Sequence, residues 1–417
     1  SSEPRRAIVL TFLISQACIL LGDLNAIAPI LTMAFMLTYA TLNLASFLES
    51  ITANPSYRPT FRYYHWSLSL LGAIACVAVM FLIQPVMAAV SIAGVIGIYQ
   101  LIGYREIQSN WGDLTSGAIL QRIRQNLLRL EMERYHPKNW RPIILALSGS
   151  AWSRTRLAVF ANWLTGRRGI LTLAQVIEGE TEELLERRAA QQALLRKFIV
   201  EQELEAFPAV VVAPSLSEGI EALVQCHGLG ALWPNTVLLG WLSDPERVES
   251  LGATLRLIAG LKRSVLAMRL CGPEELDEDS DPWEVPFGSI DVWWRGMKNG
   301  DLMLMLAHLL QQNPAWRTRP IRLLRVIGSE AGREEVLRNM AHIANTSRIQ
   351  VDPVVIVSED IAGTIQQTSQ YAALVILGFE PPIPGKELVF YEVMERFAGN
   401  LPRVLMVYNA GGMLLES

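Results

Sequence analysis

The sequence predicts a chain in two parts: four transmembrane helices, then an α/β domain with a doubly wound, mostly parallel sheet in two lobes. The charges separate the two parts, because only seven of the 36 basic and 40 acidic residues lie in residues 1–103. Long apolar runs fill this first part, whereas short apolar runs alternate with amphipathic segments after residue 138. The first pattern favours helices in a bilayer, and the second favours strands connected by covering helices.

The membrane part contains four apolar runs, at residues 7–21, 27–51, 64–83 and 86–103. About 20 apolar residues span the hydrocarbon core, so the second and third runs suffice and the fourth is marginal. The first run reaches this length only if its helix continues past Gly22. Burial in a soluble core is the alternative, but it would require a large partner domain. If the first residues are cytoplasmic, four crossings place all the flanking basic residues on that side: Arg5, Arg6, Arg58, Arg62 and Arg105.

Two features connect the membrane part to the rest of the chain. Gln84 and Pro85 leave almost no loop between the third and fourth runs, which predicts a tight helical hairpin. Residues 104–137 then form a linker, with an amphipathic helix over residues 111–133. The apolar residues of this helix are biased to one stripe: Leu114, Ile119, Ile123, Leu127, Leu128 and Leu130.

The α/β part contains ten strand candidates, separated by helical segments such as residues 181–207 and 332–344. This alternation predicts a sheet covered on both faces. We expect a first lobe over residues 138–272, an acidic solvated loop over 273–286 and a second lobe over 287–417. The expected strands are residues 143–147, 170–176, 209–213, 237–241, 264–268, 290–294, 321–327, 354–357, 374–377 and 404–407.

The residue pattern gives no support for an enzyme, a metal site or a cofactor. The net charge of −4 gives no electrostatic reason to expect nucleic acid. The four cysteines and five histidines are scattered, without the spacing of a metal site or of a nucleophile beside its base. A Ser-Gly-Ser turn at 148–150 follows the first strand, where α/β sheets often bind nucleotides, but ordinary turn chemistry explains it better.

Tyr39 is the residue of the membrane part that suggests a function, because its phenol O–H lies deep in a helix and must find a partner. One partner is an anion such as chloride, since a phenol replaces part of the ion's hydration without trapping it. A hydrogen bond to a neighbouring helix is the alternative, and the residues alone favour it. Asn43, one turn along, likewise either forms a hydrogen bond that holds two helices together or is part of a polar path.

Several segments together resemble the cation-chloride cotransporters, a family of electroneutral carriers that move chloride with sodium, potassium or both. In the membrane part these segments are residues 20–30 (LLGDLNAIAPI) and 57–64 (YRPTFRYY). Residues 110–112 (NWG) and 138–142 (KNWRP) match the start of the linker helix and of the cytosolic domain. Further matches in that domain are GLG at 228–230, PNT at 234–236, LG at 239–240 and GSIDVWW at 288–294.

The resemblance implies that the four runs are helices nine to twelve of a transporter with an amino-acid-permease-like core, and that Tyr39 helps to bind chloride. The family's sodium and potassium ligands lie on helices that match no part of this sequence, so the resemblance assigns no cation site here. It also implies a homodimer that crosses the plasma membrane several times. The cytosolic domain is expected to be related to the universal stress protein fold and to regulate transport.

Two other functions stay open. One is a membrane-tethered sensor whose soluble domain binds a nucleotide, although the turn at 378–382 (GFEPP) lacks the glycine-rich phosphate loop of nucleotide-binding members of that fold. The other is a permease for amino acids or polyamines that shares the same membrane core.

Overall fold

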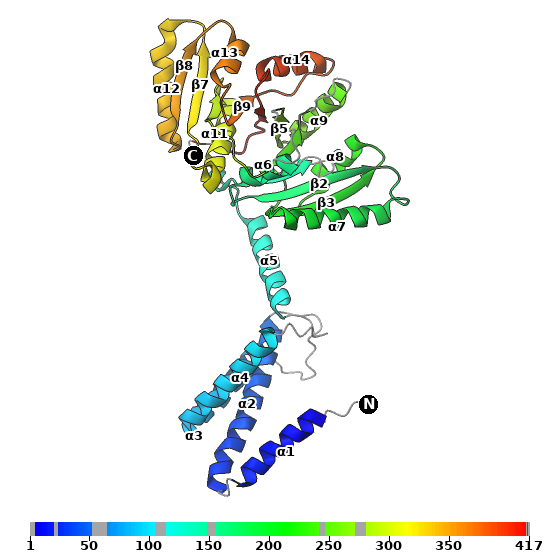
Figure 1. The fold of residues 1–417 in the computed structure, drawn as a ribbon, viewed down its shortest axis with the longest axis vertical. Helices are drawn as coiled ribbons and strands as arrows, with labels where there is room; N and C mark the ends of the chain where they lie inside the picture. The colour runs from blue at the N-terminus through cyan, green and yellow to red at the C-terminus, as the bar shows by residue number, and fades with distance from the viewer. Residues whose placement is uncertain are drawn as a thin grey trace. The chain divides into compact units, whose positions relative to one another are not determined.

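The computed structural model describes residues 5–20, 24–51, 65–104, 114–147, 155–241, 247–271, 281–413 and 415 of the chain. The chain divides into two compact units, Ser1–Met132 and Glu133–Ser417. The first unit is helical, and the second is built on a single mixed sheet with covering helices (Figure 1).

Five helices form the described part of the first unit: α1 (Arg5–Leu20), α2 (Leu24–Ile51), α3 (Trp66–Ile83), α4 (Pro85–Tyr104) and α5 (Leu114–Met132). The first four coincide with the four apolar runs, and α5 coincides with the expected linker helix. Within the described residues, two segments are long and apolar enough to cross a membrane, Ala28–Ile51 and Trp66–Ile83, while α4 contains the shorter apolar segment Pro85–Leu101. With 16 residues α1 is about 24 Å long, less than the hydrocarbon thickness, and its expected continuation past Gly22 falls outside the described residues.

The turn between α3 and α4 consists of Gln84 alone. Its backbone is extended, and its N–H donates to the Met80 carbonyl oxygen at 3.1 Å, which ends α3. Pro85 then opens α4, where a missing N–H leaves no helical hydrogen bond unmade. Met80 of α3 and Ala88 of α4 are buried together with Met33 of α2. The tight hairpin expected from the sequence is therefore confirmed, and it packs against α2.

The second unit contains a ten-stranded sheet in the order β3-β2-β1-β4-β5-β10-β9-β6-β7-β8. All neighbouring strands are parallel except β5 and β10, which are antiparallel. All ten expected strands are present, with ends shifted by at most a few residues. Their bounds are β1 (Ile143–Leu147), β2 (Ile170–Glu178), β3 (Ala206–Ala213), β4 (Thr236–Gly240), β5 (Ser264–Leu270), β6 (Ile290–Trp293), β7 (Ile321–Ile327), β8 (Asp352–Val357), β9 (Leu374–Gly378) and β10 (Arg403–Tyr408).

The strand order repeats itself. From its outer edge inward, each half of the sheet reads third, second, first, fourth and fifth strand of its own five. The sequence echoes this repeat, with VLLG at 237–240 in β4 and VILG at 375–378 in β9. The two lobes expected from the sequence are thus two halves of one continuous sheet, joined where Ala267 of β5 pairs with Met406 of β10.

Helices cover both faces of the sheet, as a doubly wound fold requires. One apolar core contains buried residues of α6 (Thr155–Thr165), α7 (Leu185–Glu201), α11 (Met297–Gln312) and α12 (Arg333–Ser347). A second core contains residues of α8 (Leu216–Cys226), α9 (Val248–Gly260), α13 (Ile361–Thr368) and α14 (Glu387–Ala398). The predicted fold class is confirmed, because apolar strands with both faces buried read as the continuous apolar runs seen in the sequence.

Among the helices that are followed by a left-handed residue other than glycine, α7 and α9 share one kind of turn. After α7, Glu203 has φ 51°, and after α9, Lys262 has φ 56°. In both cases the next residue's N–H reaches back five positions, as in the Lys262 turn, where Arg263 N donates to the Ile258 carbonyl at 3.1 Å. These are Schellman motifs, in which glycine normally takes the left-handed position because it has no Cβ.

Two segments outside the strands and helices also contact the folded unit. Of the acidic loop expected over residues 273–286, residues 273–280 lie outside the described part, but Trp283 packs edge-on against Trp163 of α6, with ring centroids 5.8 Å apart. The apolar end of that loop therefore joins the core. At the start of the unit, the Tyr135 hydroxyl donates to the carbonyl oxygen of Gly412, just after β10. The last strand is thereby tied to the segment that leads into β1.

Candidate functional site

Tyr39 lies in the middle of α2, and 53% of its side chain is exposed within the described residues. Its hydroxyl makes no hydrogen bond to any residue that the structure describes. The neighbouring-helix hydrogen bond considered as an alternative is therefore not seen in this part of the chain. The phenol O–H is open to a partner outside the described residues, and an anion fits its chemistry because the group donates without carrying charge.

Asn43 lies one turn further along α2, and its side chain serves two contacts. Its Nδ2 donates to the carbonyl oxygen of Tyr39 at 2.9 Å. Its amide group also rests on Gly72 of α3, where a Cβ would stand 2.8 Å from the Asn43 Oδ1. Asn43 is thus part of the α2–α3 contact, and it is bonded to the backbone of Tyr39, which the family resemblance predicts as a chloride contact.

Small and weakly polar residues flank this contact on α3. The Ser69 hydroxyl lies 3.3 Å from that of Ser46 on α2, and Ser69 is buried. Ala73 is also buried, next to Gly72. Small residues allow helix backbones to approach closely in a bilayer, where packing and hydrogen bonds rather than the hydrophobic effect drive association.

In the second unit, the PNT segment at 234–236 anchors the start of the sheet. Asn235 donates from Nδ2 to the Arg141 carbonyl at 2.7 Å and accepts the Ile143 N–H on Oδ1 at 3.0 Å. Its own carbonyl accepts the N–H of Ser264 at 2.9 Å, at the start of β5. Asn235, which directly precedes β4, therefore fixes the beginning of β1 through its side chain and that of β5 through its backbone carbonyl, which is a structural role.

The GSIDVWW segment contains a buried carboxylate. Asp291 of β6 is 0% exposed and accepts hydrogen bonds from the Ser289 hydroxyl at 2.6 Å and the Ser369 hydroxyl at 2.6 Å. Arg322 of β7 donates to it from Nε at 2.7 Å, and this hydrogen bond raises the pKa of Arg322. Asp291 and Arg322 face each other in register on neighbouring strands, so an acidic and a basic residue at matching strand positions could have identified the pair from the sequence.

The crevice where nucleotides bind to doubly wound sheets lies at the carboxyl ends of the strands, beside the first strand of each half. In the second half this place is filled. Asn299 donates to the Phe379 carbonyl at 2.8 Å and accepts the Asn409 N–H at 2.9 Å. The Trp294 ring lies over Gly300, so closely that a Cβ there would stand 2.4 Å from the ring. In the first half, the turn at 148–150 lies outside the described residues.

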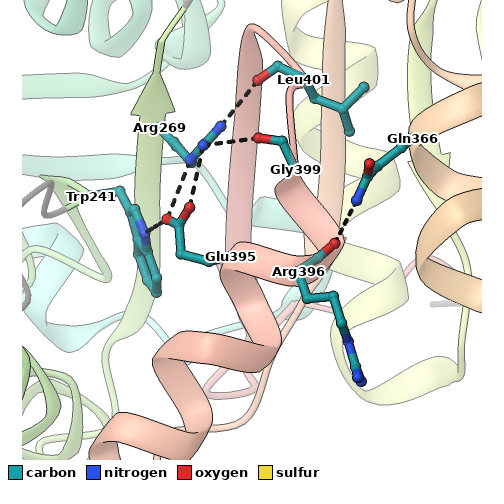
Figure 2. A network of polar contacts seen from close by, with 7 residues as sticks. All are labelled: Trp241, Arg269, Gln366, Glu395, Arg396, Gly399 and Leu401. Carbon is teal, nitrogen blue, oxygen red and sulfur yellow. Dashed lines mark hydrogen bonds and ion pairs between the residues drawn. The ribbon is translucent and has the colours of Figure 1, made fainter.

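A cluster at the joint between the halves was not predicted (Figure 2). Glu395 of α14 accepts the indole N–H of Trp241 at 2.6 Å and hydrogen bonds from Arg269 of β5 at 3.3 and 3.2 Å. Figure 2 shows Arg269 also reaching the carbonyl oxygens of Gly399 and Leu401, at 3.0 and 3.1 Å. Arg269 and Glu395 are 126 residues apart, so no spacing in the sequence indicates this pair.

The remaining titratable residues do not assemble a reactive site in the described part of the chain. No group of three His, Cys, Asp or Glu side chains there is placed to hold a metal ion. His227 bonds to the Thr172 hydroxyl at 3.0 Å, and burial lowers its pKa. Cys76, Cys226 and Cys271 are free thiols.

Comparison with known proteins gives matches over both units. Residues 1–146 match the family model Amino acid permease, and residues 154–252 match Solute carrier family 12. Cation-chloride cotransporter 1 of Oryza sativa subsp. japonica is 30% identical over 365 residues, which are 85% of this chain and 37% of the rice protein. The chain thus spans well under half the length of this relative.

Two solved structures are similar to about two thirds of this chain at low sequence identity. The cytoplasmic domain of a prokaryotic cation chloride cotransporter is 17% identical, with a TM-score of 0.48, covering 66% of this chain and 98% of that one. A universal stress protein from Archaeoglobus fulgidus DSM 4304 is 12% identical, with a TM-score of 0.42, covering 63% and 95%.

Proposed function

Because this chain belongs to the cation-chloride cotransporter family, we propose that it is the C-terminal part of a cation-coupled chloride symporter, and not an enzyme. The observation that carries the proposal is the order of the matches. An amino acid permease match covers the membrane helices, and a Solute carrier family 12 match follows in the α/β unit. A permease for amino acids or polyamines would explain the first match but not the second.

In this proposal residues 1–103 are the multi-pass membrane segment, in the plasma membrane, and residues 104–137 link them to a cytosolic regulatory domain. The coupled cation is potassium, sodium or both, bound by parts of the transporter outside this chain. The domain's two halves, residues 138–272 and 287–417, act as one body because β5 and β10 join them into one sheet.

Tyr39 is proposed as the chloride contact contributed by this chain. The support is its central place on α2, its exposed side chain and a hydroxyl without a partner in the described residues. A neutral donor suits a transported ion, since binding must be strong enough to replace water and weak enough to release the ion.

A homodimer is proposed as the working assembly, with α5 as one contact between copies. Leu120, Ile123, Leu127 and Leu130 recur at intervals of three, four and three residues, which is the spacing of a two-helix seam. The Leu120, Ile123 and Leu130 side chains are 68%, 49% and 45% exposed in the single chain. A second copy of α5 would cover this stripe. Leu120→Glu and Ile123→Glu together should lower the dimer fraction measured by light scattering in detergent.

The transport proposal is tested with the full-length protein in proteoliposomes. Tracer uptake of rubidium or sodium is measured while chloride is replaced by gluconate, with labelled amino acids and polyamines as competing substrates. Cation uptake that requires chloride is the expected result. Uptake of amino acids or polyamines without any need for chloride would overturn the proposal.

Tyr39→Phe tests the chloride contact. A hydrogen bond to a charged partner contributes about 1.5–3 kcal/mol, so its loss should raise the chloride half-saturation about 10- to 100-fold. Tyr99→Phe is the matched control, because Tyr99 lies on α4 with 79% of its side chain exposed. An unchanged half-saturation in Tyr39→Phe would remove Tyr39 from the site while leaving the symporter proposal standing.

A further inference from the structure

The contact between α2 and α3 is closest where Asn43 meets Gly72. A Cβ on Gly72 would stand 2.8 Å from the Oδ1, 3.0 Å from the Cγ and 3.3 Å from the Nδ2 of Asn43. Real Cβ atoms do not approach another heavy atom to less than 3.0 Å. The whole amide group therefore lies on the bare α-carbon of Gly72, and no other residue type fits this position without a shift.

The same amide group is fixed on its other side by the backbone of α2. Its Nδ2 donates to the Tyr39 carbonyl oxygen at 2.9 Å. In a helix this carbonyl also accepts the main-chain N–H of Asn43, and an oxygen with two lone pairs can accept both. Asn43 thus lies between the carbonyl of Tyr39, to which it donates, and the surface of α3 at Gly72.

We propose that Asn43 is a positioning residue for Tyr39, and that Gly72 provides the space it needs. The inference rests on the proposed role of Tyr39 in binding chloride. The amide of Asn43 connects α3 to the backbone of Tyr39, one helical turn away, so it sets the rotation of α2 against α3. The direction of the Tyr39 phenol follows from that rotation.

The alternative is that Asn43 only fills space between two helices. Space filling would need a small side chain at position 43 but no donor, whereas positioning needs a donor that reaches the Tyr39 carbonyl. Serine and alanine separate these cases. Both are smaller than asparagine and leave room for a methyl group on residue 72, but only serine can donate to the carbonyl four residues back.

The test compares Gly72→Ala, Asn43→Ser, Asn43→Ala and the two double variants in the full-length protein. Chloride half-saturation is measured in proteoliposomes, and thermal stability is measured in detergent. Gly72→Ala should raise the half-saturation about three- to tenfold, the cost of weakening one hydrogen bond, and lower the melting temperature. Gly94→Ala on α4 is the control, because a Cβ there meets nothing within 4 Å, and it should change neither quantity.

The double variants decide the inference. Asn43→Ser with Gly72→Ala should restore both melting temperature and chloride half-saturation. Asn43→Ala with Gly72→Ala should restore the melting temperature and leave the half-saturation raised. Equal half-saturation in the two double variants would show that Asn43 only fills space and would overturn the inference.

The experiments distinguish a failure of the positioning role of Asn43 from a failure of the proposed transport function. If Tyr39→Phe raises the half-saturation and none of the Asn43 or Gly72 variants does, the positioning role fails and the chloride site stands. If uptake in the unmodified protein does not depend on chloride, the proposed function fails first. Should Gly72→Ala not fold, the single variants Asn43→Ser and Asn43→Ala give the same decision, because only the first keeps a donor.

Discussion

Removing the carboxylate of Glu395 should loosen the joint between the two halves of the sheet. The carboxylate accepts the Trp241 indole N–H at 2.6 Å and two hydrogen bonds from Arg269 (Figure 2). In Glu395→Ala the Trp241 N–H loses its partner, and Trp241 is only 7% exposed. Arg269, with 12% of its side chain exposed, keeps the carbonyl oxygens of Gly399 and Leu401 but loses its counter-charge.

The magnitude follows from the burial of these groups. A buried neutral donor left unpaired costs about 1–3 kcal/mol, and breaking a fully buried ion pair costs about 3–5 kcal/mol. The Glu395 side chain is 30% exposed, so solvent reduces the second figure. We expect a total loss of about 3 kcal/mol, which corresponds to an increase of about 100-fold in local opening.

Hydrogen exchange followed by mass spectrometry measures this opening in the purified chain. Peptides from α14 and β5 should exchange about 100-fold faster in Glu395→Ala, whereas peptides from α7, at the far edge of the first half, should not change. Glu392→Ala is the control, since Glu392 is an exposed glutamate one turn earlier in the same helix. Unchanged exchange in α14 would refute the reasoning, because it would mean that β5 pairing and apolar packing hold the joint without the carboxylate.

Two further predictions concern the stability of the second unit. Lys262→Gly should raise the free energy of unfolding, measured by urea denaturation, by about 1 kcal/mol. The reason is that glycine adopts the φ of 56° without the strain that a Cβ causes. A lower stability would mean that the lysine side chain makes a contact that outweighs this strain. Because burial lowers the pKa of His227, the unfolded state binds the proton more readily than the folded state. Stability should therefore be highest above the unfolded value of about 6.5 and should fall as the pH drops through the lower folded value. His227→Gln should flatten this dependence between pH 7.5 and 5.5, and an unchanged slope would contradict the assignment to His227.

The strands were predictable because both faces of the sheet are covered, so each strand is a continuous apolar run. The starts of two strands could not be predicted from the sequence. β3 begins at Ala206 and β8 at Asp352, in each case before a proline, Pro208 or Pro353, that argues against a strand. Both strands lie at the edges of the sheet, where a missing N–H on the outer side leaves no partner unpaired. Edge position is a property of the strand order, which the local sequence does not contain.

The candidate site likewise has features that the sequence predicts and features that it does not. Tyr39 could be singled out from the sequence because a phenol deep in an apolar helix needs a partner, and its chloride role, which stays a prediction, came from the family resemblance. The contact of Asn43 with Gly72 could not be found, because it depends on how two helices are rotated against each other. The same is true of Arg269 and Glu395, whose meeting depends on the pairing of β5 with β10.

The antiparallel joint of β5 and β10 has a topological consequence for the two ends of the cytosolic unit. It reverses the direction of the second five strands, so β10 ends at the same edge of the sheet at which β1 starts, with β4 and β5 between them. The Tyr135 hydroxyl, in the segment before β1, donates to the carbonyl oxygen of Gly412, in the segment after β10. A displacement of the residues just before β1 therefore acts at both ends of this unit's fold, through the chain on β1 and through Tyr135 on the segment that follows β10.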